Sequence, residues 1–199
     1  MASTPVAALR KFIRSREPEE RCDTCGAALS AEHGHNFEPA VRRIRCACES
    51  CAMLYSTVYR PIPKRVCVLR NFQISDAQWD ELMIPISLAF FSHSTPAGRM
   101  VALYPGPAGA AESMLRLDFW EEVAATNPIM RTMEPDVEAL LVNRVGSARE
   151  YFIAPIDECY KLVGLIRLHW RGLSGGALVW GEIAKFFDQL RQKDNGCQD

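Results

Sequence analysis

The sequence lacks the motifs that define most common enzyme classes. It has no glycine-rich dinucleotide-binding fingerprint, no phosphate-binding Gly-Lys-Ser/Thr motif, no nucleophile elbow and no paired catalytic carboxylates. His93 and His169 stand alone, without a serine or cysteine nucleophile at a motif spacing, so no catalytic triad is predicted. We therefore expect no catalytic residues, no organic cofactor and a protein that is not an enzyme.

A strong charge of one sign and long apolar runs are also missing. The net charge of −1 gives no overall attraction to nucleic acid or to an anionic membrane. No apolar run reaches the length that crosses a bilayer, and the N-terminus lacks a hydrophobic signal core followed by a cleavage site. The cysteines are clustered rather than spread as a disulfide framework, which predicts a reducing, cytoplasmic setting.

What the sequence does have is a cysteine cluster near its N-terminus. Cys22 and Cys25 form one Cys-x-x-Cys pair, and Cys48 and Cys51 form a second. Two such pairs supply the four thiolates of a tetrahedral structural zinc site. Gly26 follows the first pair and lets the backbone turn beneath the ion with a positive φ. We predict that these four cysteines bind the metal and that the metal is zinc.

Other ligands and other chemistries remain open for this cluster. Cys46 precedes Cys48 by two residues and can replace it as a ligand. His33 or His35 can also replace a cysteine, although a solvent-exposed loop is the simpler expectation for both. Four thiolates suit iron as well, which would make the protein a redox carrier. A dithiol–disulfide redox pair is a further interpretation, but such pairs usually occur singly.

Composition divides the chain into three parts. Residues 1–20 predict a helix over residues 6–16 followed by a charged linker, and residues 21–60 predict the metal-binding module. Residues 61–199 predict a larger α+β domain, which begins at the proline pair of residues 61–63. The expected fold class is α+β, with a zinc-ribbon-like or treble-clef-like module before a mixed, mainly antiparallel sheet with packed helices.

Periodicity and capping residues predict the individual elements. Ser75 and Gln78 form a capping box that predicts a short helix ending before Pro85, and a similar pattern at Asp118 predicts a helix that stops before Pro128. Residues 104–109 predict a Pro/Gly loop. Apolar faces predict two closing helices, from about residue 157 and about residue 177. Strands are expected at residues 41–45, 65–73, 86–93, 99–104, 137–144 and 151–154, the fifth of which also suits a helix.

Two further candidate sites have simpler explanations. Arg42, Arg43 and Arg45 make the module mildly basic, as in a zinc-dependent nucleic-acid-binding regulator. No aromatic stripe accompanies them, so nucleic acid is not the expected partner. The glycine-rich turn from Arg171 to Gly176 can hold an anion at the start of the next helix, but a plain helix connection also explains it.

The remaining cysteines lie outside the cluster. Cys67 and Cys159 fall on apolar faces, which predicts buried side chains that behave as small hydrophobes. Cys197 lies in a polar C-terminal stretch, where we expect an exposed thiol without a fixed partner.

Motifs across most of the chain resemble a bacterial family of unknown function. They include Cys22-x-x-Cys25-Gly26, His33-x-His35, Cys46-x-Cys48-x-x-Cys51, Ala154-Pro-Ile-Asp-Glu-Cys-Tyr160 and Trp170-Arg-Gly-Leu-Ser-Gly-Gly176. The genes of that family tend to lie beside those for actinobacterial-type nickel–iron hydrogenases and their maturation factors. The resemblance implies an accessory protein for hydrogenase assembly, metal handling or electron delivery. Its implied partner is a hydrogenase subunit or a maturation factor.

Overall fold

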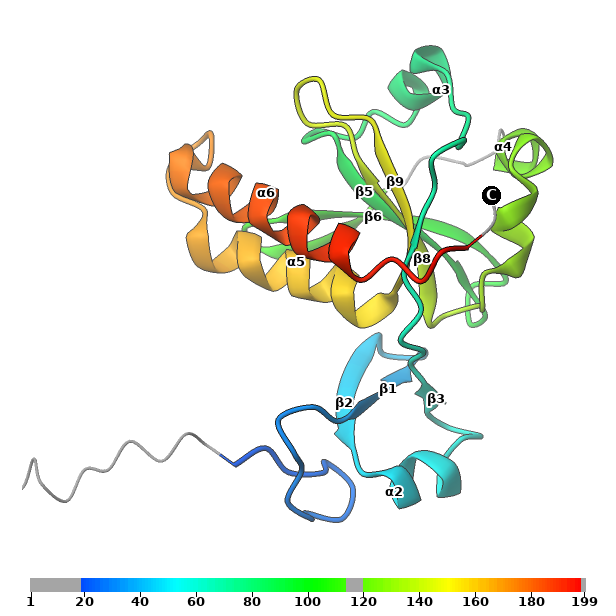
Figure 1. Cartoon of the computed structure of the whole chain (residues 1–199), viewed down its shortest axis with the longest axis vertical. Helices are drawn as coiled ribbons and strands as arrows, with labels where there is room; N and C mark the ends of the chain where they lie inside the picture. Colours follow the sequence, from blue (N-terminus) through cyan, green and yellow to red (C-terminus); the bar gives the residue numbers. More distant parts are fainter. Residues whose placement is uncertain (1–18, 114–119, 198–199) are drawn as a thin grey trace, which may run out of the picture.

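The computed structural model describes residues 19–113 and 120–197. The helix expected over residues 6–16 and the capping residue Asp118 lie outside these ranges. The described chain forms a small N-terminal sheet and a larger sheet flanked by helices (Figure 1). All recorded strand pairs are antiparallel, which confirms the α+β class and the antiparallel sheet. The division at residues 60 and 61 stays a prediction.

The small sheet has three strands in the order β2-β1-β3. Its elements are β1 (Gly34–Glu38), β2 (Arg43–Ala47), the helix α2 (Glu49–Leu54) and β3 (Arg60–Pro61). The expected strand at residues 41–45 begins two residues later than predicted. Arg42 has a φ of 52° in the turn after β1, and a residue with positive φ cannot extend the strand.

The larger sheet has six strands in the order β4-β9-β8-β5-β6-β7. They are β4 (Cys67–Val68), β5 (Leu88–Ser94), β6 (Arg99–Gly106), β7 (Gly109–Glu112), β8 (Glu138–Asn143) and β9 (Glu150–Pro155). The hairpin of β5 and β6 is confirmed. The segment that also suited a helix is the strand β8, which is buried throughout and pairs with strands on both sides.

The prediction of a loop at residues 104–109 is wrong. β6 continues to Gly106, and the chain turns back at Gly109 into β7. Pro105 is tolerated inside a strand because it lies beyond Leu103, where the pairing of β6 with β5 ends. One side of the strand is therefore free of ladder hydrogen bonds at the proline. The long strand expected at residues 65–73 is likewise reduced to the two residues of β4.

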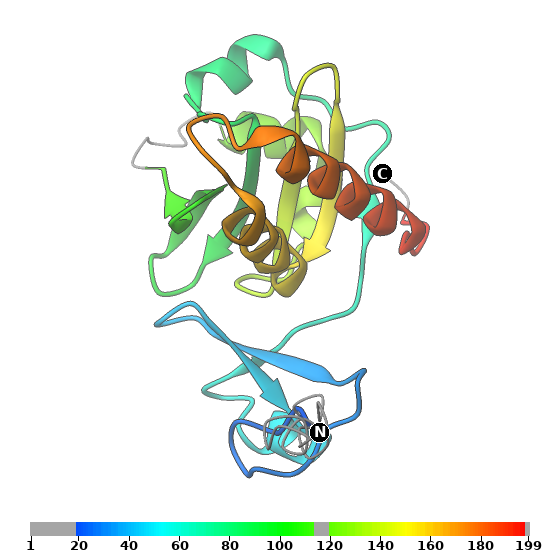
Figure 2. The same cartoon turned by 90° about the vertical axis from the view of Figure 1, so that its left-hand side faces the viewer.

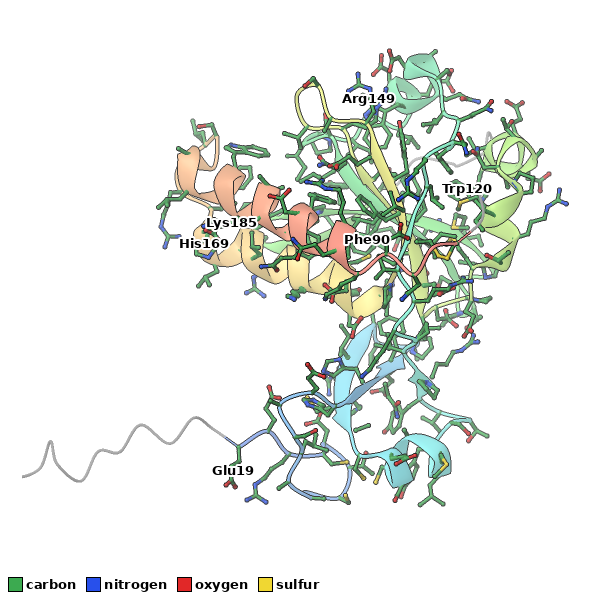
Figure 3. The ribbon with its side chains drawn as sticks, in the orientation of Figure 1. Glu19, Phe90, Trp120, Arg149, His169 and Lys185 are labelled. Carbon is green, nitrogen blue, oxygen red and sulfur yellow. A yellow bond between two sulfur atoms is a disulfide. The ribbon has the colours of Figure 1, made fainter. Side chains whose placement is uncertain are left out.

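Helices cover both faces of the larger sheet. Successive strand residues point to opposite faces, so Phe90 packs with the apolar residues of the two closing helices, whereas Phe91 stacks on Trp120 at 5.2 Å between ring centroids. Phe90 and Trp120 are labelled in Figure 3. The closing helices α5 (Ile156–His169) and α6 (Gly176–Gln192) lie side by side over the first face (Figure 2). The other face carries α3 (Asp76–Glu81), α4 (Trp120–Thr126) and the 3-10 helix η1 (Pro128–Thr132).

The capping residues of α3 behave as predicted. Ser75 Oγ accepts a hydrogen bond from Gln78 N, and Gln78 Oε1 accepts one from Ser75 N, so the capping box of α3 is confirmed. No helix among the described residues is both long and apolar enough to cross a membrane.

The C-terminal segment corrects the expectation for Cys197. Cys197 forms a disulfide with Cys67 of β4 instead of a free, exposed thiol. The segment before it lies along β4, where Asn195 Oδ1 accepts from Val66 N at 2.8 Å and Asn195 N donates to Val66 O at 2.9 Å. The cysteine pattern did not indicate this pair, so the argument for a reducing setting loses one of its premises.

The small sheet packs against the larger domain through β1 and β3. Phe37 is 5% exposed, and its ring lies 6.3 Å from that of Tyr160 on α5. Arg60 Nη1 donates to Asp136 Oδ2 at 3.0 Å, and this aspartate is almost fully buried. These contacts fix the position of β1, which carries His35, relative to the start of α5.

Candidate metal centre

The first cysteine pair lies in a tight turn. Cys22 N donates to Ala27 O, and Gly26 N donates to Cys22 O, both at 2.8 Å. Gly26 has a φ of 74°, a left-handed conformation that side chains other than glycine rarely adopt. The turn folds the chain back on itself, so that Cys25 comes to lie next to Cys22.

The second cysteine pair lies at the start of a helix. Cys48 is the N-cap residue of α2, and Cys51 is buried in the first turn of the same helix. Residues three apart on a helix share one side, so both sulfurs face the same point. Ala52 N donates to Cys48 O at 2.9 Å, which confirms that the helix begins at this cysteine.

The two pairs meet at a single point. The four sulfur atoms of Cys22, Cys25, Cys48 and Cys51 all lie within 4.8 Å of one another. Cys25 Sγ and Cys48 Sγ are 3.7 Å apart. Four thiolates bound to zinc at about 2.3 Å in a tetrahedron are separated by about 3.8 Å, and a disulfide needs about 2.05 Å. The arrangement therefore fits a four-coordinate metal ion and does not fit disulfides.

The thiols of this group differ in acidity. Hydrogen bonding from the backbone of Cys48 lowers the pKa of Cys22 below its ordinary value, although burial opposes this effect. Burial raises the pKa of Cys51, and the neighbouring thiols add to the rise. Packing four thiolates together without a cation is unfavourable, whereas a divalent ion compensates their charge. The donor set thus suits a positively charged metal.

His33, His35 and Cys46 form a separate group. One possible ligand atom from each lies within 4.8 Å of the others. The prediction that both histidines lie in a solvent-exposed loop is wrong, because the His33 side chain is only 6% exposed and His35 lies in β1. His35 Nδ1 lies 2.9 Å from Asp157 Oδ2, and this hydrogen bond raises the pKa of His35. In Cys46, burial and the nearby carboxylate of Asp23 raise the pKa.

Packing accounts for the glycine-rich turn between α5 and α6. Gly175 has a φ of 82°, and a Cβ atom there would lie 2.8 Å from Val179 Cγ1. Arg171 Nη1 donates to the carbonyl oxygens of Leu168 and Trp170 within the same turn. The turn therefore connects two packed helices, and its arginine already has partners.

Two of the three arginines considered for nucleic-acid binding are also engaged inside the protein. Arg45 donates to Glu38 Oε2 from Nε at 3.0 Å and from Nη2 at 2.8 Å. Arg42 Nη2 donates to Glu112 Oε2 on β7 at 2.6 Å. A phosphate backbone would have to compete with these carboxylates, so the pattern does not favour nucleic-acid binding.

Fold and site together define an α+β protein with antiparallel sheets and a cluster of four cysteines that can hold a metal ion. Comparison with family models gives a match over residues 21–194 to a family described as a family of unknown function (DUF5947). The chain belongs to this family. The match takes in the cysteine cluster and the larger sheet, so both are parts of one family unit. No curated protein and no solved structure matches the chain.

Proposed function

We propose that the chain is a non-enzymatic accessory protein whose four-cysteine centre binds a structural zinc ion. The observation that supports this most is the sulfur geometry, with Cys25 Sγ and Cys48 Sγ 3.7 Å apart and all four sulfurs within 4.8 Å. Such a closed thiolate set leaves no open position for catalysis. The free energy of binding the ion then contributes directly to folding of the small N-terminal module.

A treble-clef-like module is the form of zinc module that the element order supports. The first cysteine pair lies in a turn, a hairpin of β1 and β2 follows, and Cys48 and Cys51 come from the start of α2. In a ribbon, the second pair would lie in another turn between strands. The helical origin of the second pair therefore favours the treble-clef-like alternative.

The module would dock onto a protein partner through its exposed apolar side chains. Met53, Leu54, Tyr55 and Val58 lie in and directly after α2, and Leu54 is 76% exposed. Exposed apolar groups close together in the chain are typical of protein interfaces. Burying a side chain of this size contributes about 1.5–3 kcal/mol, so a few of them suffice to anchor a partner.

The partner in this proposal is a subunit or a maturation factor of a nickel–iron hydrogenase, in the cytoplasm. This part rests on the resemblance of the cysteine, histidine and C-terminal motifs to the hydrogenase-associated family. An iron-bearing redox carrier would use the same four cysteines and is distinguished by its metal. A nucleic-acid-binding regulator is less favoured, because Arg42 and Arg45 already form ion pairs with glutamates.

Metal analysis tests the zinc proposal. The full chain would be expressed without added metal, desalted and measured by elemental analysis and absorption spectroscopy. We expect a colourless protein with tightly bound zinc, which Cys48→Ser loses and the control Cys159→Ala keeps. Cys159 is fully buried on α5, far along the chain from the cluster, and its removal leaves all four proposed ligands. Iron with visible absorption would support the redox carrier, and a metal-free, folded protein would overturn the proposal.

Co-purification from a hydrogenase-producing host tests the docking proposal. Wild type should recover a hydrogenase subunit or maturation factor, and Leu54→Glu should lose it. Leu173→Glu is the matched control, because Leu173 is also an exposed leucine but lies between α5 and α6. If Leu54→Glu still recovers the partner, the proposed docking surface is wrong. If wild type recovers neither a hydrogenase subunit nor a maturation factor, the proposed hydrogenase partner is wrong.

A further inference from the structure

The hairpin of β1 and β2 gathers a second set of metal-binding side chains. His35 and Cys46 are direct partners in the antiparallel register, so their side chains share a face with Cβ atoms about 4.5–5.5 Å apart. His33 lies directly before β1, and its ring centroid is 4.9 Å from that of His35. One possible ligand atom of each residue lies within 4.8 Å of the other two.

Both imidazole rings are held through the same nitrogen. His33 Nδ1 lies 3.0 Å from Ser30 O, and His35 Nδ1 lies 2.9 Å from Asp157 Oδ2. An oxygen acceptor at Nδ1 fixes the proton there and leaves the lone pair on Nε2. Histidines that bind metals are commonly oriented in this way, by a carbonyl or carboxylate oxygen at the nitrogen that does not bind the ion.

One of the two free nitrogens is buried without a partner. His33 Nε2 has no hydrogen-bond partner, and its side chain is only 6% exposed. A buried polar atom left in this state costs about 1–3 kcal/mol. A purely structural histidine would be expected to use both ring nitrogens. The unsatisfied nitrogen thus indicates a ligand that completes its coordination.

We propose that His33, His35 and Cys46 form a second binding site for a divalent transition-metal ion, separate from the four-cysteine centre. Two imidazoles and one thiolate suit first-row ions such as zinc, cobalt or nickel, and they do not suit calcium or magnesium. With three protein ligands the site keeps an open position, in contrast to the closed four-thiolate set. The inference goes beyond the accessory function and does not depend on the identity of the partner.

A cavity lies beside the two histidines, between the module and the larger domain. The cavity has a volume of about 470 Å³ and is lined by both histidines together with Lys64, Asp157 and Lys193, among others. Water or a small ligand can reach the ion from this side, so the second ion exchanges more readily than the first. Asp157 at the start of α5 is a positioning residue, because its carboxylate is hydrogen-bonded to Nδ1 of His35.

Cys46 also links the two centres through the backbone. Cys46 N donates to Asp23 Oδ2 at 2.8 Å, and Asp23 N donates to Cys46 O at 2.9 Å. Asp23 lies within the turn that carries Cys22 and Cys25. The second site therefore takes its shape from a turn that the first ion stabilises.

Stepwise metal titration of the full chain tests the second site. Protein freed of metal with a chelator under reducing conditions would be titrated with Co²⁺ alone and, in parallel, with Zn²⁺ against a chromophoric chelator. We expect two ions per chain, with the weaker one bound second. Its thiolate-to-cobalt absorption should be roughly a quarter of the first step, because one thiolate binds in place of four.

Ligand variants separate the two centres. Cys46→Ser and His35→Gln should each bind one ion and keep the first step unchanged, whereas His93→Gln, on an exposed residue of β5, should bind two. Asp157→Asn should lower the affinity for the second ion about 10–100-fold and leave the affinity for the first unchanged. Circular dichroism checks folding, and His35→Gln gives an independent result if Cys46→Ser does not fold.

The possible outcomes decide the proposal. A single ion in wild type, or two ions retained in folded Cys46→Ser and His35→Gln, would overturn it. Failure of the hydrogenase partner to co-purify changes neither titration, so the two proposals fail independently.

Discussion

Phe37 connects the metal module to the larger domain, and its removal should uncouple them. The side chain is 5% exposed, lies opposite Ile44 across the hairpin and contacts Tyr160 of α5. Phe→Ala in a core costs about 3–5 kcal/mol. Tyr160 and Ile44 are themselves only partly buried, so the site can partly fill with water or collapse. We therefore expect Phe37→Ala to lower the free energy of unfolding by about 3 kcal/mol.

Hydrogen–deuterium exchange measured by mass spectrometry shows which part of the protein is destabilised. Amides of β1 and β2 should exchange faster, while those of β8 and β9, in the centre of the larger sheet, should not change. The proposed zinc ion should remain bound in this variant, because no cysteine is changed. Tyr55→Ala is the control, since Tyr55 is an exposed aromatic residue of the same module. Equal acceleration in β8, or none in β1, would refute the role given to Phe37.

Three further predictions concern a buried ion pair, the disulfide and the metal. Asp136→Asn should lower the free energy of unfolding in urea by about 2 kcal/mol, less than for a fully buried pair, because Arg60 is 37% exposed and can be hydrated. Reduction of the disulfide, or Cys197→Ser, should lower the free energy of unfolding by up to about 5 kcal/mol, because the disulfide closes a loop of 130 residues. Thiol labelling under non-reducing conditions shows whether the disulfide has formed. Chelation of metal should speed amide exchange in residues 20–61 and leave β5 and β8 protected, and uniform loss of protection would contradict separate folding of the module.

Local signals in the sequence predicted the features that depend on neighbouring residues. The capping box of Ser75 and Gln78 contains both partners within four residues, and the β5–β6 hairpin joins strands that are adjacent in the chain. The four clustered cysteines belong to the same class, since each Cys-x-x-Cys pair is brought together by a single turn or helix start. Spacing alone carries this information.

Features built from distant residues could not be predicted in this way. The partner of His35 is Asp157, which is 122 positions away and looks in the sequence like an ordinary acidic residue at a helix start. Cys67 and Cys197 are separated by 130 positions with no pattern that pairs them. The His33-x-His35 spacing did signal a shared face, but its meaning depended on burial, which no local rule supplies.

The two candidate metal centres differ in what they can do for the protein. The four-cysteine set satisfies a metal completely, and its ligands come from elements too short to be stable alone, such as the six residues of α2. An ion held by these cysteines would therefore bind as the module folds. The His33, His35 and Cys46 set instead relies on a hairpin already folded and on Asp157 from the larger domain. Coupling between two binding sites is reciprocal. If the ion in the four-cysteine centre raises the affinity of the second site, the second ion must raise the affinity of the four-cysteine centre by the same factor. An exchangeable ion at the cavity would thereby tighten the contact of module and domain, through the same β1 strand that carries Phe37.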